Sequence, residues 1–292
     1  MTAVTEIKLE LANGPTRVSR ILYDGCPLCE SGDIQSLRHG DCSRRPCYHP
    51  IISPTINWMV CNSCSHVFTD GYFSPEASAI IFEKTLPQQL PGANFEQHRK
   101  LSANMIEKVA QYISTGSWLD VGFGNGSLLF TAEEWGFRPV GIDLRPSTVA
   151  AMQRLGFEAN CADLQSFGED QSIDVLSLAD VLEHMPFPMD GLLAARRLLR
   201  DGGILLVSMP NYNCPAWRLL DAGNVNPYWG ELEHFHNFSK KRLYALADEA
   251  GFEVVRYGIS ERYRVCMEVL FRRKRNYSDT PESPIRSSQD AN

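Results

Sequence analysis

Residues Trp118–Gly126 read WLDVGFGNG, a short apolar run that leads through Asp120 into three alternating glycines. Glycine lets the backbone turn sharply and lets a ligand approach the main chain with no Cβ in the way. The residues that follow, SLLFTAEEW, are compatible with a helix. A strand, a glycine-rich turn and a helix in this order are typical of nucleotide-binding α/β folds. We therefore expect Gly122, Gly124 and Gly126 to contact part of a nucleotide-containing cofactor.

Two more acidic residues follow this loop, each after a short apolar run: Asp143 closes VGID and Asp163 lies in CADL. A carboxylate after the second strand can accept hydrogen bonds from both ribose hydroxyls. Asp163 is placed to accept a hydrogen bond from an adenine amino group. The third glycine of the loop comes one residue earlier than in the Gly-x-Gly-x-x-Gly loop of dinucleotide-binding folds. This spacing disfavours a Rossmann dehydrogenase, which is a third functional alternative.

Short apolar runs alternate with helical segments from Trp118 onward, which predicts an α/β fold with a parallel sheet and helices on both faces. We assign residues 118–275 to this domain, with an aromatic insertion at about 211–238. Residues 74–117 read as a helical linker. Residues 276–292 are polar and rich in Pro and Ser, so we expect a disordered tail.

The first 73 residues contain six of the nine cysteines. Two Cys-x-x-Cys pairs, Cys26 with Cys29 and Cys61 with Cys64, supply the four thiolates of a closed tetrahedral zinc site, which is structural. The pairs are further apart than the roughly 15 to 20 residues of a minimal ribbon. One of the residues between the pairs could therefore replace a zinc ligand, or these residues could form a second site. They are His39, Cys42, Cys47 and His49. We expect residues 1–73 to form a small zinc-ribbon-like module.

Composition restricts the partners of the chain. Of its 292 residues 43% are hydrophobic and 22% charged, and the formal net charge is −7, which disfavours nucleic acid as a partner. The N-terminus has no signal-peptide pattern, and no apolar stretch approaches the roughly 20 residues that cross a bilayer. We expect a cytoplasmic protein that keeps its thiols reduced, does not engage a membrane and acts on a small molecule. The sequence does not indicate an oligomeric state.

The motifs WLDVGFGNG, VGIDLRP, CADL, IDVLSLADVLEHM, LLRDGGILLVSMPN and EHFHNFSKKRLYALADEAGFEVV follow one another along the chain. From about residue 95 to 270 the chain resembles class I S-adenosylmethionine-dependent methyltransferases, especially the group with ubiquinone-type O-methyltransferases and natural-product methyltransferases. The resemblance implies a Rossmann-like class I sheet with S-adenosylmethionine as cofactor. It assigns the methionine part of the cofactor to Asp120 and the loop of Gly122, Gly124 and Gly126, and the ribose to Asp143. It assigns the adenine to Asp163 with Leu164 and the sulfonium pocket to Ala179 and Asp180. Leu144 is a further expected cofactor contact.

The cysteine-rich segment is similar to the zinc-binding domain that precedes the catalytic domain in certain sugar C-methyltransferases. Outside the cysteines and the stretch WMVCNSCSHVFTDGYFSP, the substrate-binding residues of that subgroup have no match in this chain. A sugar is therefore one acceptor among several. A module of this kind, docked in front of the cofactor cleft, would shape a substrate pocket.

Three histidines are candidates for a general base: His234, His184 and His236. Histidine titrates near neutral pH, which suits proton removal from a phenol, an enol or an activated carbon acid. The leading hypothesis is a methyltransferase acting on an oxygen or carbon atom of a small natural product or cofactor precursor. The alternative is a methyltransferase-fold protein whose zinc module recruits or modifies a protein or RNA partner. The basic run Arg272–Arg275 slightly favours this alternative.

Overall fold

The structure is a computed structural model of the chain, and it describes residues 20–50, 52–83 and 89–275. The predicted tail at 276–292 lies outside the described residues. Within the described ranges no helix is long and apolar enough to span a membrane.

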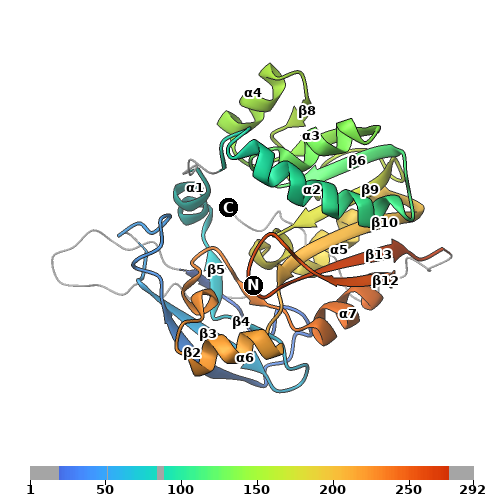
Figure 1. Ribbon diagram of the computed structural model, residues 1–292. Coiled ribbons are helices and arrows are strands. Elements are labelled where there is room, and N and C mark those ends of the chain that lie inside the picture. Colours follow the sequence, from blue (N-terminus) through green and yellow to red (C-terminus); the bar gives the residue numbers. More distant parts are fainter. Residues whose placement is uncertain (1–19, 51, 84–88, 276–292) are drawn as a thin grey trace.

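A seven-stranded sheet forms the larger part of the molecule (Figure 1). Its strands are β6 (Gly116–Val121), β7 (Phe137–Ile142), β8 (Glu158–Asn160), β9 (Ile173–Ala179), β10 (Leu199–Pro210), β12 (Phe252–Ile259) and β13 (Cys266–Arg273). They are arranged in the order β12-β13-β10-β9-β6-β7-β8. This confirms the Rossmann-like sheet expected from the sequence.

The sheet is mixed: one strand, β13, departs from the parallel arrangement that the alternating runs predicted. The pairs β6–β7, β6–β9, β7–β8 and β9–β10 are parallel, whereas β13 is antiparallel to both β10 and β12. Only a short connection joins β12 to β13. A parallel crossover needs a dozen or more residues, so these two strands form a hairpin.

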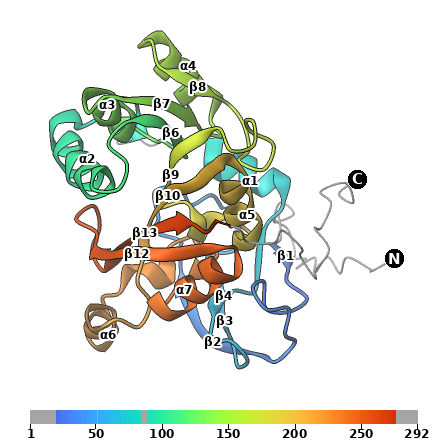
Figure 2. The same cartoon turned by 90° about the vertical axis from the view of Figure 1, so that its right-hand side faces the viewer.

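Helices cover both faces of the sheet. They are α2 (Phe95–Ala110), α3 (Ser127–Glu134), α4 (Pro146–Arg154), α5 (Pro188–Leu198) and α7 (Lys240–Glu249). Alternate residues of a strand point to opposite faces: Leu119 of β6 belongs to the core under α5 and α7, and Trp118 to the core under α2 and α3. Figure 2 shows α2 and α3 on one side of the sheet and α5 on the other. Because both faces are covered, the central strands read as continuous apolar runs.

The N-terminal segment forms two small antiparallel sheets. Strand β1 (Arg20–Leu22) pairs with β5 (Gly71–Phe73), and α1 (Pro75–Glu83) follows. The second sheet has the order β11-β4-β3-β2, with the strands β2 (Ile34–Asp41), β3 (Thr55–Cys61), β4 (Val67–Thr69) and β11 (His236–Asn237). Strand β11 comes from the insertion, so the predicted module and the predicted insertion share one sheet.

Side chains also join the module to the insertion, which carries α6 (Pro215–Ala222) and the 3-10 helix η3 (Pro227–Gly230). The indole Nε1 of the buried Trp58 donates to the carbonyl of Trp229 at 2.9 Å. Gly40 of β2 approaches the same carbonyl so closely that a Cβ at Gly40 would overlap it. One apolar cluster therefore contains residues of both segments.

Candidate functional site

The glycine loop lies at the carboxyl end of β6, where ligands bind in open α/β sheets. Gly122, Gly124 and Gly126 all have positive φ, at 65°, 54° and 74°. Residues other than glycine rarely adopt this backbone conformation. The backbone N–H of Gly124 donates to Oδ2 of Asp143 at 3.3 Å. The structure thus brings together the loop and the first carboxylate that the sequence placed after it.

Asp143 is buried and paired with Arg145. Arg145 Nε donates to Oδ1 at 2.9 Å and Nη2 donates to Oδ2 at 2.8 Å, while Nη1 donates to Oε1 of Gln89 at 3.0 Å. A bidentate guanidinium–carboxylate pair is a strong, directional contact. Sequence reasoning missed Arg145 as a partner, although it stands in the quoted motif VGIDLRP two residues after the carboxylate.

Asp120 is buried at the end of β6 and accepts a hydrogen bond from Oγ of Ser177 at 2.5 Å. Burial raises the pKa of Asp120 to about 7, and the Ser177 hydroxyl opposes this rise. A carboxyl group with this pKa changes charge near neutral pH, which is common at functional sites.

The acids after the third and fourth strands have different surroundings. Asp163 is exposed and accepts from the backbone N–H of Gln165 at 2.8 Å, beside the buried Leu164. Asp180 follows the buried Ala179 of β9 at a φ of 60°, accepts from Oγ of Ser208 at 3.1 Å and lies 3.4 Å from Nη1 of Arg262. Arg262 comes from the β12–β13 connection, and no local motif identified it. Leu144, another expected cofactor contact, is 62% exposed.

The half-buried His184 and the buried His234 lie beside the buried Glu183. His184 ends the 3-10 helix η2 (Leu182–His184), directly after the carboxyl end of β9, and its ring lies 4.7 Å from that of His234 in an edge-to-face arrangement. Nδ1 of His184 is 2.8 Å from the carbonyl of Glu233. Glu183 and both histidines each offer one ligand atom, and these three atoms lie within 4.8 Å of one another. Sequence reasoning missed Glu183 as a member of this cluster, although it directly precedes His184 in the motif IDVLSLADVLEHM.

Burial has opposite effects on the charges of this cluster. It raises the pKa of Glu183 well above its usual value, with Asp180 adding to the rise. It lowers the pKa of His234 well below its usual value, and the neighbouring His184 adds to that effect. Both side chains therefore favour their neutral forms. The ring of Tyr228 stacks on His234 with centroids 6.1 Å apart.

His236 occupies a different place from the other two candidate bases. Its Nδ1 is 3.0 Å from Nε2 of His66 and its Nε2 is 2.9 Å from the carbonyl of Met185. Burial lowers the pKa of His236 to about 3. Both ring nitrogens of His236 are therefore engaged with the protein.

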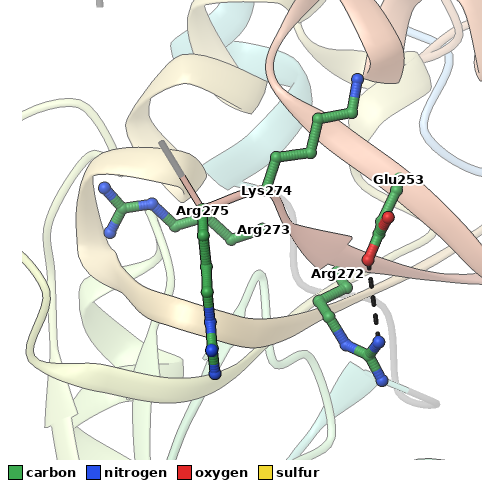
Figure 3. Close-up of a pocket in the computed structure, with 5 residues that line it drawn as sticks. All are labelled: Glu253, Arg272, Arg273, Lys274 and Arg275. Atoms are coloured by element: carbon green, nitrogen blue, oxygen red, sulfur yellow. Dashed lines mark ion pairs between the residues drawn. The ribbon is translucent and has the colours of Figure 1, made fainter. Parts of the chain in front are cut away.

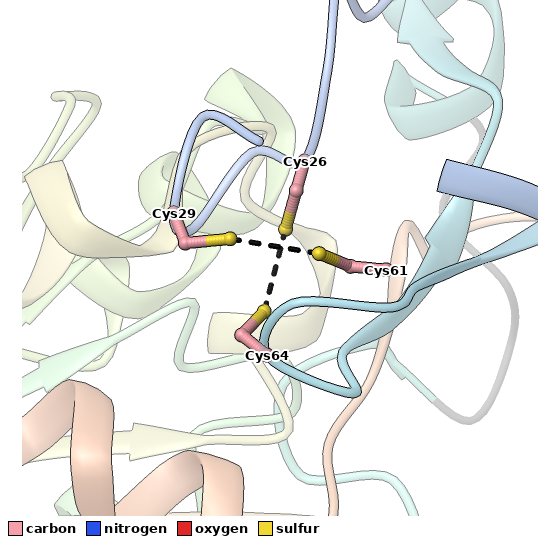
Figure 4. Close-up of side chains that lie close together, drawn as sticks. All are labelled: Cys26, Cys29, Cys61 and Cys64. Atoms are coloured by element: carbon pink, nitrogen blue, oxygen red, sulfur yellow. Dashed lines mark hydrogen bonds between the residues drawn. The ribbon is translucent and has the colours of Figure 1, made fainter. Parts of the chain in front are cut away.

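Four cysteines gather where the β1–β2 connection meets the turn between β3 and β4 (Figure 4). Sγ of Cys26 is 3.6 Å from Sγ of Cys64, and Sγ of Cys29 is 3.6 Å from Sγ of Cys61. Four sulfurs bound to one tetrahedral zinc ion at about 2.3 Å lie about 3.8 Å apart. The donor set and its spacing therefore fit a structural zinc ion.

The other sulfur and imidazole groups of the N-terminal segment lie outside this cluster. The thiol of Cys42 donates to the carbonyls of Ser53 and Pro54 at 3.4 and 3.2 Å. Nδ1 of His39 is 2.8 Å from Oδ1 of Asn57. Burial, together with the Glu233 carboxylate, raises the pKa of Cys47 to about 12. Within the described residues, neither His39, Cys42, Cys47 nor His49 joins a group of metal-ligating side chains.

The basic run at the end of β13 lines a surface hollow with Glu253 (Figure 3). Arg272 pairs with Glu253, Arg273 with Asp201 and Lys274 with Asp248. These acids neutralise three of the four basic side chains within the chain itself.

Residues 94–257, more than half of the chain, match the protein family described as Methyltransferase domain. The chain therefore belongs to this family, and its fold and motifs are those of a class I S-adenosylmethionine-dependent methyltransferase.

Curated relatives match part of the chain. The ubiquinone biosynthesis O-methyltransferase of Saccharophagus degradans is 32% identical over 125 residues, which are 40% of this chain and 52% of the relative. The enzyme of the same name from Pasteurella multocida is 26% identical over 153 residues, 46% of this chain and 63% of the relative. The chain thus spans about half the length of the curated relatives it matches.

Solved structures share the fold. A protein of Pyrococcus horikoshii superposes with a TM-score of 0.52 at 17% identity, covering 65% of this chain and 96% of the other. Magnesium protoporphyrin IX methyltransferase of Synechocystis, solved with S-adenosylhomocysteine, gives a TM-score of 0.50 at 18% identity, covering 61% and 84%. Similarity at this level of identity shows the fold alone.

Proposed function

We propose that this chain transfers the methyl group of S-adenosylmethionine to an oxygen or carbon atom of a small molecule, with an oxygen acceptor favoured. The observation that carries the proposal is the arrangement at the carboxyl edge of the sheet. The glycine loop contacts Asp143 there, and His184 follows β9 next to His234 of the insertion. A cofactor site and a proton-accepting pair thus share one edge of the sheet.

Each part of the cofactor has a proposed partner. Asp120 and the glycine loop would hold the methionine part, Asp143 and Leu144 the ribose, and Asp163 with Leu164 the adenine. Ala179 and Asp180 would line the sulfonium pocket. For the ribose to bind, Arg145 must give up at least one of its hydrogen bonds to Asp143.

The acceptor would lie between the insertion and the end of β9. Aromatic side chains of the insertion are buried there, among them Tyr228, Trp229 and Phe235, and they can exclude water from a planar acceptor. In-line transfer from a sulfonium needs orientation, exclusion of water and removal of the acceptor proton. His234 or His184 would receive that proton. Because the relatives are named O-methyltransferases, a hydroxyl group is the first acceptor class to test.

The four-cysteine cluster would hold a structural zinc ion that shapes the acceptor pocket, because its sheet includes β11 of the insertion. The module at residues 1–73 would then act together with the insertion at 211–238, which belongs to the catalytic domain at 118–275. Cysteines that are not joined in disulfides fit a reducing cytoplasm. Recruitment of a protein or RNA partner is less well supported, because the basic run is largely paired within the chain.

Two measurements test the proposal. Calorimetric titration with S-adenosylhomocysteine should show binding with one site per chain, and nicotinamide nucleotides should not bind. The chain should then move a labelled methyl group from S-adenosylmethionine to one member of a panel of phenols, catechols, enols and deoxysugar nucleotides. Absence of S-adenosylhomocysteine binding by folded protein would refute the proposal.

A further inference from the structure

We propose that Glu183, His184 and His234 form a second metal site, which binds a divalent cation separately from the four cysteines. The cation would bind an acceptor oxygen beside the sulfonium, and for this role the inference rests on the function proposed above. The metal site itself stands on the geometry of the three side chains.

The three side chains come from two segments that the fold holds together. Glu183 and His184 belong to η2, and His234 belongs to the insertion. The backbone N–H of Phe235 donates to the carbonyl of Glu183 at 2.9 Å, and this bond fixes the two segments against each other. The three ligand atoms lie within 4.8 Å of one another. Ligand atoms about 2.1 Å from one ion lie roughly 3 to 4 Å apart, so small side-chain rotations complete the site.

Unpartnered polar atoms indicate that this cluster can bind a cation. Glu183 is 1% exposed, and neither of its carboxylate oxygens has a hydrogen-bond partner. Nδ1 of the buried His234 also lacks a partner. Buried polar groups in native proteins are nearly always hydrogen-bonded, paired or bound to metal. A divalent cation between Glu183 and the histidines would supply the partner that the carboxylate lacks.

His184 is already oriented as a ligand. Its Nδ1–H donates a hydrogen bond to the carbonyl of Glu233 at 2.8 Å. In the neutral imidazole the lone pair of Nε2 is then available to bind a metal ion. Metal-binding histidines almost always donate their second ring N–H to a carbonyl or carboxylate, and this bond fixes the tautomer.

The ligand set predicts the kind of ion. Two imidazoles and one carboxylate suit Zn²⁺, Mn²⁺ or Fe²⁺ and leave coordination positions open, whereas four thiolates form a closed zinc site. An acceptor hydroxyl that takes an open position loses its proton more readily, because the cation stabilises the oxyanion. The proton leaves to solvent, a new O–CH₃ bond forms, and the S–CH₃ bond breaks with its electron pair remaining on sulfur. The cation would then replace a free histidine base in ionising the acceptor.

The experiment is a titration with Mn²⁺, followed by electron paramagnetic resonance, of protein that carries one zinc ion per chain, held by the four thiolates, and that is saturated with S-adenosylhomocysteine. Mn²⁺ prefers oxygen and nitrogen ligands and does not compete for the four thiolates. We expect one Mn²⁺ per chain. Glu183→Gln and His234→Gln should each weaken its binding by at least about tenfold. His98→Gln, which removes a histidine of α2 outside the cluster, should bind Mn²⁺ as the unaltered chain does.

Folding is controlled by the melting temperature and by S-adenosylhomocysteine binding of each variant. Glu183→Gln keeps the size of the side chain and removes no hydrogen bond of the carboxylate oxygens. The inference is overturned if the unaltered chain binds S-adenosylhomocysteine but no Mn²⁺, or if folded Glu183→Gln binds Mn²⁺ with unchanged affinity. If the chain does not bind S-adenosylhomocysteine, the proposed function is refuted. The Mn²⁺ titration is then done in the absence of S-adenosylhomocysteine, and it still decides whether the metal site exists.

Discussion

Both carboxylate oxygens of Asp143 accept hydrogen bonds from the guanidinium of Arg145, at 2.9 and 2.8 Å. The backbone N–H groups of Arg145 and Gly124 donate to the same carboxylate, so the side chain proposed to hold the ribose is already satisfied. Cofactor binding at this point is an exchange of partners. The ribose hydroxyls must replace hydrogen bonds from Arg145, whose Nη1 also donates to Gln89.

We predict that Asp143→Asn weakens binding of S-adenosylhomocysteine by about 10 to 100-fold. The amide keeps the size of the side chain but loses one acceptor and the charge, and hydrogen bonds to charged groups contribute about 1.5 to 3 kcal/mol. Calorimetric titration measures the change. Asp170→Asn is the matched control, because Asp170 is exposed and pairs with Arg197. This variant should bind S-adenosylhomocysteine as the unaltered chain does. Equal affinities for the two variants would remove Asp143 from the cofactor site.

We predict that S-adenosylhomocysteine binds more tightly as pH rises from about 6 to about 7.5. Burial raises the pKa of Asp120 to about 7, and the ligand ammonium prefers the ionised carboxylate. At pH 6 most of the Asp120 population is protonated, so the affinity should be lower by close to an order of magnitude. Titrations at both pH values measure it. The pH dependence should largely disappear in Asp120→Asn, whereas the same dependence in this variant would assign the titration to another group.

Local sequence patterns predicted the elements around the cofactor loop well. The apolar runs ending at Asp120 and Asp143 are β6 and β7, and the loop between β6 and α3 has the positive φ values that its glycines allow. These features depend on residues close together in sequence, whose periodicity and glycine spacing carry the information.

Contacts between distant segments were not predicted. Strand β11 has two residues and exists only because β4, far away in the sequence, pairs with it. Arg262 reaches Asp180 from the β12–β13 connection, and no periodicity marks such a contact. Glu183 stands beside a histidine chosen as a candidate base, but only the course of η2 turns it into the interior.

We predict that Cys64→Ser lowers the zinc content from about one ion per chain and lowers the melting temperature. Serine does not replace a thiolate as a zinc ligand, and structural zinc contributes folding free energy directly. The effect should spread to the insertion, because β4 follows the Cys64 turn and pairs with β11. Metal analysis and thermal unfolding measure both changes. Cys161→Ser, at an exposed cysteine outside the cluster, should keep its zinc. Full zinc content in Cys64→Ser would exclude the four-cysteine site.

We predict that Trp58→Phe destabilises the chain by about 1 to 3 kcal/mol, because the carbonyl of Trp229 then loses its hydrogen bond inside a buried cluster. Trp135→Phe is the matched control: that indole is 42% exposed, so the change should stay within about 0.5 kcal/mol. Urea unfolding measures both. Because Trp58 belongs to the module and Trp229 to the insertion, Trp58→Phe should also weaken acceptor binding while affinity for S-adenosylhomocysteine stays the same. Destabilisation with unchanged acceptor binding would mean that the module supports the fold but does not shape the acceptor pocket.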